Sequence, residues 1–512
     1  MSLGDTIAAV ATAPGRGGVA VVRVSGPEAF KVAERLTGHT PKPRRVSLES
    51  ISDPNSTLID TAVVLAFKGP NSYTGEDVVE FQCHGGSVTP RRVLEACFAS
   101  GARLARRGEF TERAFLNGKL SYEEAESVLD LVDAKTDCAA DAALRGVSGE
   151  CRKATREIYD ALVDLSSTAE HALDVSEDEL PDGFLDRIAS SVASIATRLD
   201  EAIRRAKEGK ILRDGALVVI AGPPNAGKSS LLNALLGESR AIVSATPGTT
   251  RDSIEEWLDV GGWPVRLVDT AGLRETNDTI EGEGVARARD LMKKADIVLN
   301  LTPADGEPTG GTSGTDGTYV TDGTGVVIEV LSKCDLIVNS EDYGSRYHSA
   351  VSRSAIAVHE NPDGDGLVAR SGGALAGTTT IGVPVSAKTG EGLDALRGAI
   401  AAELERKAAE PGDGNSALGR DASALIEARA LLSQTPPLPH SPTPSLPHSP
   451  TPPLSHSLTS PLLHSSTPPL PPDLVLLANG VRAAAEKLGE AIGATYSADM
   501  LDALFSRFCV GK

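Results

Sequence analysis

The sequence predicts a multidomain protein of the α/β and α+β classes, with an α+β part, an all-α part and a doubly wound parallel sheet. Three observations support this prediction. Short β-rich runs alternate with turns over residues 1–120, helical periodicity dominates over 121–213, and apolar runs alternate with helical stretches over 214–408. The chain has 512 residues, enough for about three domains of ordinary size.

Residues 1–120 carry strand and helix signals in mixed order. The runs "GVAVVRVSG" and "DTAVVLAF" are typical of strands, and "PEAFKVAERLTG" predicts a helix that ends at Gly38. The next segment begins with "SYEEAESVLDLVDAKT", in which a serine cap and acidic residues precede apolar residues at three- and four-residue spacing. An α+β domain is therefore expected before a helical one.

From residue 214 the runs "ALVVIAG", "VRLVDTAG", "ADIVLNLT" and "VVIEVLSKCD" end in turns, and helical stretches lie between several of them. This alternation predicts a parallel sheet wrapped by helices, with ligands at the carboxyl ends of its strands. The segments 303–325 and 338–380 are polar and glycine-rich, so we expect flexible insertions there.

Residues 409–512 are expected to be helical again, interrupted by a Pro/Ser/Thr/His tract at 435–472. Its histidines recur every eight residues, at His440, His448, His456 and His464. Because a proline-rich chain is extended, successive rings would lie roughly 25 Å apart. The tract is interpreted as a low-complexity linker and not as a metal site.

Charge argues against a protein that coats nucleic acid. The chain has a net charge of −20, with 50 basic and 70 acidic residues, whereas such proteins are basic. Any nucleic-acid contact would use a local patch, such as Arg103, Arg106 and Arg107, although an ordinary solvated surface is the alternative interpretation.

Several features favour a cytoplasmic protein with no membrane segment. The six cysteines form no CxxC pair, and the N-terminus lacks the basic start and apolar core of a signal peptide. No apolar run approaches the ~18 residues that span a bilayer.

The segment "GPPNAGKS", residues 222–229, follows an apolar run and precedes a helical one, as a phosphate-binding loop requires. Its glycines let backbone N–H groups face phosphates, Lys228 neutralises charge on the β- and γ-phosphates, and the Ser229 hydroxyl suits Mg²⁺. The residue types thus predict a nucleotide site.

Three further motifs follow in order. Thr250 of "TPGTTRD" is a candidate second Mg²⁺ ligand, and Asp269 of "DTAG" suits Mg²⁺ through water. In "SKCD", Asp335 can accept hydrogen bonds from guanine, whereas Ser332 stands where the usual N-K-x-D pattern has asparagine. That shorter side chain raises the question of a weaker tie to the base or the phosphate loop. Together with "SAK" at 386–388, the motifs favour GTP over ATP.

The candidate GTP-binding residues are Asn225, Ala226, Gly227, Lys228, Ser229, Ser230, Ser244, Ala245, Thr246, Pro247, Gly248, Thr249, Thr250, Asp269, Thr270, Ala271, Gly272, Ser332, Lys333, Asp335, Ser386, Ala387 and Lys388.

Four segments outside these motifs carry a family resemblance. They are "DTIAAVATAPGRGGVAVVRVSGPEA", "NSYTGEDVVEFQCHGG", "RRGEFTERAFLNGKLSYEEAE" and the C-terminal "FCVGK". With the embedded GTPase motifs, they make the chain similar to the MnmE (TrmE) family of tRNA modification GTPases over most of its length. The three insertions depart from the family's length.

The resemblance implies a folate-binding and dimerisation domain at the N-terminus. It also implies a discontinuous helical domain into which a Ras-like P-loop GTPase domain is inserted. The family acts as a homodimer and forms a heterotetramer with the FAD-dependent protein MnmG. It builds a carboxymethylaminomethyl or aminomethyl group at C5 of the wobble uridine of tRNA, using 5-formyl- or methylene-tetrahydrofolate. By resemblance, the folate contacts are Arg23, Glu80, Lys119 and Lys512, each of which alone resembles a surface charge. Cys509 receives no catalytic role.

In "DTAGLRET", Leu273 stands where a Ras-like enzyme has glutamine, and no arginine is placed to replace it. Asn225 offers a carbonyl oxygen of the kind that binds monovalent cations. By resemblance, K⁺ is held there together with oxygens around Ser244, Thr246 and Thr249. The same resemblance makes Glu281 the catalytic residue that positions water, whereas its residue type alone fits a solvated acid at a helix start.

Two other functions stay open at this point. One is a GTPase switch in ribosome assembly. The other is a folate-dependent one-carbon transferase whose GTPase domain has decayed, which Ser332 and the insertions would fit.

Overall fold

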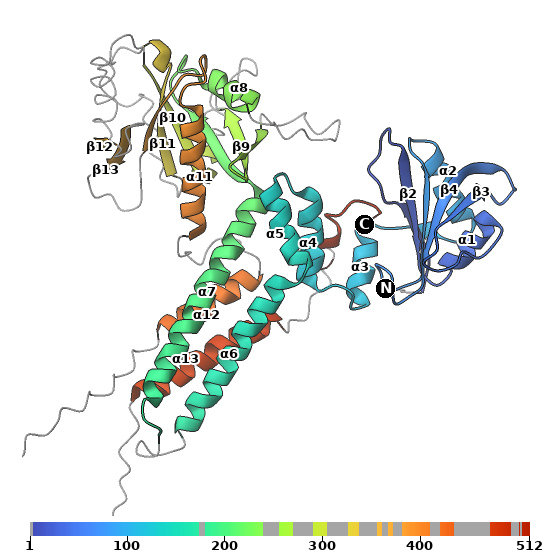
Figure 1. Cartoon of the computed structure of the whole chain (residues 1–512), viewed down its shortest axis with the longest axis horizontal. Helices are drawn as coiled ribbons and strands as arrows, with labels where there is room; N and C mark the ends of the chain where they lie inside the picture. The colour runs from blue at the N-terminus through green and yellow to red at the C-terminus, as the bar shows by residue number, and fades with distance from the viewer. Residues whose placement is uncertain are drawn as a thin grey trace, which may run out of the picture. The chain divides into compact units, whose positions relative to one another are not determined.

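The structure is a computed structural model (Figure 1). It describes residues 4–173, 180–238, 255–269, 290–304, 326–336, 356–360, 367–371, 381–409, 420–434, 472–492, 501 and 504–511.

Residue contacts divide the chain into two compact units. The first unit comprises Met1–Asp133, Ala143–Lys153 and Gly493–Lys512, and the second comprises Ala134–Ala142 and Ala154–Ile492. This division joins the C-terminal residues to the N-terminal part of the chain.

The first unit is built on one sheet with the strand order β3-β4-β5-β2-β1-β6. The strands are β1 (Ile7–Val10), β2 (Val19–Ser25), β3 (Ser47–Ser52), β4 (Leu58–Phe67), β5 (Val78–His84) and β6 (Arg103–Leu104). Neighbouring strands are antiparallel, except that β1 and β6 are parallel. The strands predicted at "GVAVVRVSG" and "DTAVVLAF" are confirmed as β2 and β4.

Helices α1 (Ala29–Thr37) and α2 (Thr89–Ala99) share one apolar core with the sheet. The predicted stop at Gly38 is confirmed, because this glycine has φ 83° and its N–H bonds the carbonyl of Glu34. Val22, Val24 and Phe81 face this core. Since strand side chains alternate, Arg23 and Glu80 point to the opposite face.

Three shorter helices follow: α3 (Glu109–Leu116), α4 (Tyr122–Asp133) and α5 (Asp137–Val147). The predicted serine cap of α4 is confirmed. The Glu124 N–H donates to Ser121 Oγ at 3.2 Å, and the Ser121 N–H donates to Glu124 Oε2 at 2.7 Å. This reciprocal pair satisfies two backbone donors at the helix start.

The second unit contains a doubly wound sheet with the strand order β14-β11-β10-β7-β9-β8, in which only β8 is antiparallel to its neighbour. Its strands are β7 (Ala216–Ala221), β8 (Glu255–Val260), β9 (Trp263–Asp269), β10 (Ile297–Pro303), β11 (Val326–Ser332) and β14 (Ile381–Val385). Helices α8 (Lys228–Glu238) and α11 (Leu393–Ala409) pack on one face, and the apolar side chains of Leu291, Met292 and Ala295 pack on the other. The predicted α/β domain is confirmed.

Four long helices form a second core in this unit: α6 (Glu150–Leu173), α7 (Phe184–Asp214), α12 (Arg420–Ser433) and α13 (Pro472–Ile492) (Figure 1). Leu162, Leu199, Leu425 and Val481 each contribute to it. Helices α6 and α7 precede the doubly wound sheet in the sequence, whereas α12 and α13 follow it. The all-α domain is therefore discontinuous, as predicted.

The predicted insertions differ in how much of them the structure describes. Within 338–380, strands β12 (Ile356–Glu360) and β13 (Leu367–Ser371) form an antiparallel hairpin, which the polar composition did not predict. The segment 303–325 is described only at its first two residues, and 435–472 only at Pro472. Among the described helices, none is long and apolar enough to cross a membrane.

Candidate functional site

The phosphate-binding loop connects β7 to α8 and depends on unusual backbone angles. Gly222 has φ 144°, and a Cβ there would lie 2.6 Å from the carbonyl oxygen of Leu301. Gly227 has φ 89° and Asn225 has φ 62°. Asparagine is one of the few residues other than glycine that adopt this left-handed conformation readily. These backbone angles therefore explain why glycine or asparagine occupies positions 222, 225 and 227.

Lys228 begins α8 and is buried within the loop. Its Nζ donates to the carbonyl oxygens of Gly222 at 3.1 Å and Pro223 at 2.8 Å. The ammonium group thus lies against the loop backbone at the N-terminal end of a helix, where anions are favoured. This is the setting predicted for the β- and γ-phosphates.

Ser229 and Asp269 meet at the same place. The Ser229 hydroxyl donates to Asp269 Oδ2 at 2.6 Å, which links the loop to the carboxyl end of β9. A hydroxyl and a carboxylate are hard oxygen donors of the kind that Mg²⁺ prefers, so these residues fit the predicted metal. Thr250, the other predicted ligand, lies outside the described residues.

Ser332, at the end of β11, also reaches the phosphate loop. Its hydroxyl donates to the carbonyl oxygen of Ala226 at 2.6 Å and lies 3.4 Å from that of Thr302. The side chain is buried, so this bond is shielded from water. The serine therefore keeps a direct tie between the base-side strand and the phosphate loop, despite its short side chain.

Asp335 is oriented by the last predicted motif. The Ser386 hydroxyl donates to Asp335 Oδ1 at 2.7 Å, and the Thr389 N–H donates to Ser386 Oγ at 3.2 Å. Ser386 is fully buried, whereas Lys388 is exposed and Ala387 is half-buried. Among the described residues, no hydrogen bond reaches Asp335 Oδ2, so this oxygen can accept from a base edge.

Two neighbours complete the base-side loop. Lys333 has φ 60°, a strained value for a long side chain. Burial, together with the nearby Glu391 and Asp335 carboxylates, raises the pKa of Cys334 to about 11. Its thiol is therefore neutral and serves packing.

The structure thus brings together the phosphate loop, Asp269, and the base-side residues of the "SKCD" and "SAK" motifs. Outside the described residues lie Ser244, Ala245, Thr246, Pro247, Gly248, Thr249, Thr250, Thr270, Ala271, Gly272, Glu281 and Lys512. Their roles stay predictions. Of the four residues predicted to hold K⁺, only Asn225 is described, and it is exposed; Ser230 in α8 is exposed as well.

A second candidate site lies in the first unit, on the face of the sheet opposite α1 and α2. Arg23 and Glu80 are register partners on β2 and β5, and Arg23 Nε donates to Glu80 Oε1 at 2.7 Å. Lys119 follows α3, and its Cγ would lie 3.3 Å from a Cβ placed on Gly75. Two of the four predicted folate residues are therefore paired, and a third lies beside the loop between β4 and β5.

The C-terminal residues approach the same sheet. Gly511 has φ 108°, and a Cβ there would lie 2.2 Å from the carbonyl oxygen of Val10, at the end of β1. Val510 forms a backbone bridge with Arg107, and Cys509 is exposed. Only glycine fits this approach, which explains its place in the "CVGK" motif.

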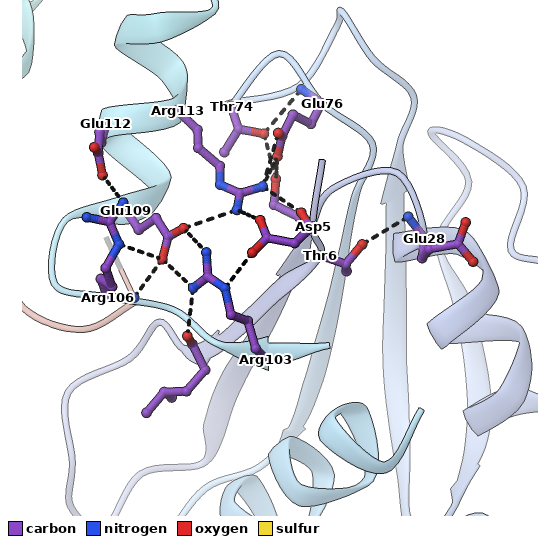
Figure 2. Close-up of polar contacts among 12 residues, drawn as sticks. Asp5, Thr6, Glu28, Thr74, Glu76, Arg103, Arg106, Glu109, Glu112 and Arg113 are labelled. Atoms are coloured by element: carbon purple, nitrogen blue, oxygen red, sulfur yellow. Dashed lines mark hydrogen bonds and ion pairs between the residues drawn. The ribbon is translucent and has the colours of Figure 1, made fainter. Parts of the chain in front are cut away.

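Sequence reasoning missed a network of buried charges in this unit (Figure 2). Arg113 is 2% exposed and donates to Asp5 Oδ1 at 2.6 Å, Glu109 Oε1 at 3.0 Å and both Glu76 oxygens at 3.1 Å. Arg103 donates to Asp5 Oδ2 at 2.6 Å and to Glu109. The only local signal is the Glu109–Arg113 pair at i,i+4 spacing on α3.

The network shifts the titration of its members. Burial alone would raise the pKa of Glu109, but hydrogen bonds from Arg103, the Arg106 N–H and Arg113 outweigh it and lower the pKa to about 2. Hydrogen bonds from Arg103 and Arg113 likewise hold the pKa of Asp5 below its usual value. Both carboxylates are ionised at neutral pH.

Two of the three arginines of the suggested basic patch, Arg103 and Arg106, are paired with carboxylates. Arg103 pairs with Asp5 and Glu109, and Arg106 donates to Glu112 at 2.8 Å. Asp5, just before β1, and the α3 residues Glu109 and Glu112 lie beside these two arginines. The sequence alone did not reveal this proximity. The charge of these two arginines serves the fold of this unit.

Comparison with known proteins identifies the family. The family descriptions "GTP-binding protein TrmE N-terminus" and "MnmE helical domain" match residues 6–119 and 123–509. Proteins named tRNA modification GTPase MnmE are 36% identical in Nitrosomonas eutropha, over 100% of both chains, and 38% identical in Symbiobacterium thermophilum, over 99% of both. A solved structure of Aquifex aeolicus Era is 24% identical, covers 42% of this chain and 66% of its own, and has a TM-score of 0.25, too low to support an argument. The chain belongs to the MnmE (TrmE) family of tRNA modification GTPases.

Proposed function

We propose that the chain binds and hydrolyses GTP and uses that cycle in modifying the wobble uridine of certain tRNAs. Its relatives over the whole chain are named tRNA modification GTPases. The observation that carries the proposal is the convergence of Lys228, Ser229 and Asp269 at one loop, to which Ser332 ties the base-side strand.

Each described residue has a distinct task in this proposal. Lys228 faces the β- and γ-phosphates, Ser229 and Thr250 are the Mg²⁺ ligands, and Asp269 contacts Mg²⁺ through water. When bound, Mg²⁺ neutralises charge that develops on the phosphate oxygens. Asp335 accepts hydrogen bonds from the N1–H and N2–H₂ of guanine, which adenine lacks.

Hydrolysis requires charge stabilisation that Leu273 does not provide. We propose that Asn225 holds K⁺ together with oxygens of Ser244, Thr246 and Thr249, and that this ion supplies the missing positive charge. Glu281 positions the attacking water. Two chains then act as a homodimer whose GTPase domains meet.

The N-terminal α+β part, residues 1–120 in the predicted boundaries, is proposed to bind a tetrahydrofolate derivative. Arg23, Glu80, Lys119 and Lys512 are its proposed contacts. The pairing of Arg23 with Glu80 supports this, because it places hydrogen-bond donors beside an acceptor.

The proposed partner protein is the FAD-dependent protein MnmG. In the proposed domain organisation, the helical segments 121–213 and 409–512 flank the GTPase domain, residues 214–408.

The test is nucleoside analysis of tRNA from a strain that lacks this gene, complemented with the wild-type chain or with Lys228→Ala. The wild type should restore a C5-modified wobble uridine, and Lys228→Ala should not. If deletion left the tRNA nucleosides unchanged, tRNA modification would be wrong, and a switch in ribosome assembly would become the better interpretation.

A second test concerns the catalytic residue. Glu281→Ala should abolish K⁺-stimulated GTP turnover while the affinity for GTP stays unchanged. Unchanged turnover in this variant would overturn the role of Glu281.

A further inference from the structure

Arg23 is held by two aromatic rings as well as by Glu80. Its guanidinium carbon lies 5.5 Å from the centre of the Tyr73 ring and 5.6 Å from that of Phe110. Both distances fall within the range of cation–π attraction. The two rings come from the loop between β4 and β5 and from α3, so three separate parts of the unit converge on one side chain.

The two rings are themselves fixed. Phe110 is fully buried beside Ile7, Ala9 and Ala105. Tyr73 as a whole residue is 37% exposed, but its hydroxyl forms a hydrogen bond with Thr111 Oγ1 at 2.9 Å. The Tyr73 loop is thereby tied to α3 one residue beyond Phe110.

The buried charge network holds the backbone on which both rings stand (Figure 2). Thr74, next to Tyr73, shares a hydrogen bond of 2.8 Å with Ser25, which lies two residues after Arg23 on β2. Glu109, next to Phe110, is bound by Arg103 and Arg113, and Arg113 also binds Glu76 of the loop. The loop and the helix cannot separate without breaking buried ion pairs, which is costly.

The result is an arginine with a fixed orientation and unused donors. Arg23 Nε is committed to Glu80, while its two terminal nitrogens donate no hydrogen bond within the part of the chain that the structure describes. The side chain is 22% exposed. A guanidinium held in one conformation loses little freedom when it binds an oxygen acceptor.

We propose that Tyr73 and Phe110 are positioning residues, which hold Arg23 so that its terminal nitrogens meet an oxygen acceptor of the ligand in the first unit. This inference rests on the proposed binding of a tetrahydrofolate derivative there. It adds two residues that act through Arg23 and not on the ligand itself.

The test measures the affinity of the full-length protein for 5-formyltetrahydrofolate by titration calorimetry. Tyr73→Leu should weaken binding by about threefold to thirtyfold, the range of a cation–π contact. Tyr73→Phe keeps the ring and should bind within about twofold of the wild type. Equal affinity of Tyr73→Leu and wild type would overturn the proposal, as would an equal loss in both variants.

A double-mutant cycle separates positioning from direct contact. Arg23→Gln removes the cation on which the rings act and keeps an amide donor, so that weaker binding stays measurable. In that background, Tyr73→Leu should weaken affinity by less than about twofold. If the two losses multiply, Tyr73 acts on the ligand directly or loosens the domain, and the proposal is wrong.

Two controls complete the design. Tyr159→Leu removes an equivalent ring, 5.3 Å from Arg156, in the second unit and should leave the folate affinity unchanged. GDP affinity should stay unchanged in every variant, which shows that the second unit is folded. Failure of the wild type to bind 5-formyltetrahydrofolate would overturn the proposed folate function itself, whereas wild-type binding with an inert Tyr73→Leu overturns only the positioning role.

Discussion

In the second unit the predicted nucleotide-binding residues lie at or just beyond the carboxyl ends of strands, whereas in the first unit Arg23 and Glu80 lie within strands. The former are fixed mainly by hydroxyl groups, as in the bonds from Ser229 to Asp269 and from Ser332 to the Ala226 carbonyl. Arg23 is fixed by a carboxylate and two rings, next to a network of buried charges.

The difference has an energetic consequence. One hydrogen bond makes a net contribution of about 0.5–1.5 kcal/mol. Single substitutions in the nucleotide site should therefore lower nucleotide affinity by a similarly small free energy. Removing one partner of a buried ion pair costs about 3–5 kcal/mol. The first unit should therefore respond to single changes more abruptly than the nucleotide site.

The largest expected effect is on stability. Arg113→Met leaves three carboxylates, those of Asp5, Glu76 and Glu109, without their shared partner. We expect the first unit to lose about 3–5 kcal/mol of unfolding free energy, measured by urea denaturation. Arg91→Met, which removes the exposed pair with Glu95, should cost less than about 1 kcal/mol. Similar losses in both variants would contradict the comparison.

The same network predicts acid sensitivity. The folded-state pKa of Glu109 is about 2, below its ordinary value of 4.5. Because it is lowered, its contribution to stability is fully present above about pH 4.5 and is lost as the pH falls toward 2. Glu109→Gln should be less stable at neutral pH and lose less stability over that window. Parallel pH profiles for the two proteins would show that Glu109 is not the titrating group.

Ser332→Ala should have a smaller effect, on nucleotide binding. The variant leaves the buried Ala226 carbonyl without the Ser332 hydroxyl, so we expect GDP affinity to fall by roughly tenfold. The preference for GDP over ADP should stay unchanged, because the hydroxyl donates to the loop and not to the base. A loss of base preference, measured with fluorescent nucleotides, would place Ser332 at the base instead.

Ser386→Ala should have the smallest effect. It removes one of the bonds that orient the Asp335 carboxylate, which predicts a loss of about 1 kcal/mol in guanine affinity. Affinity for ADP should not change. An effect larger than that of Ser332→Ala would reverse the proposed order.

The same comparison explains what the sequence could predict. The phosphate loop, Asp269 and Asp335 were predictable because each belongs to a short motif that follows an apolar run. The capping pair of Ser121 and Glu124 was visible because it too is a short motif. Local chemistry decides these positions.

The side-chain contacts of the first unit were harder to predict from the sequence because they join residues that are far apart along the chain. Arg113 meets Asp5 across 108 positions, and Arg23 meets Glu80 across 57. Arg23 and Glu80 were predicted only through family resemblance, and nothing in the sequence singled out Tyr73 or Phe110 around them. The reach of Ser332 to the phosphate loop was equally invisible, because it depends on the separation of two strands in the folded sheet.

The most direct test of the proposed function is the rate of GTP hydrolysis by the full-length protein in KCl and in NaCl, for the wild type and Asn225→Ala. We predict fast turnover by the wild type in KCl, slow turnover in NaCl, and slow turnover by Asn225→Ala in both salts. Equal wild-type rates in the two salts, unaffected by Asn225→Ala, would contradict this prediction.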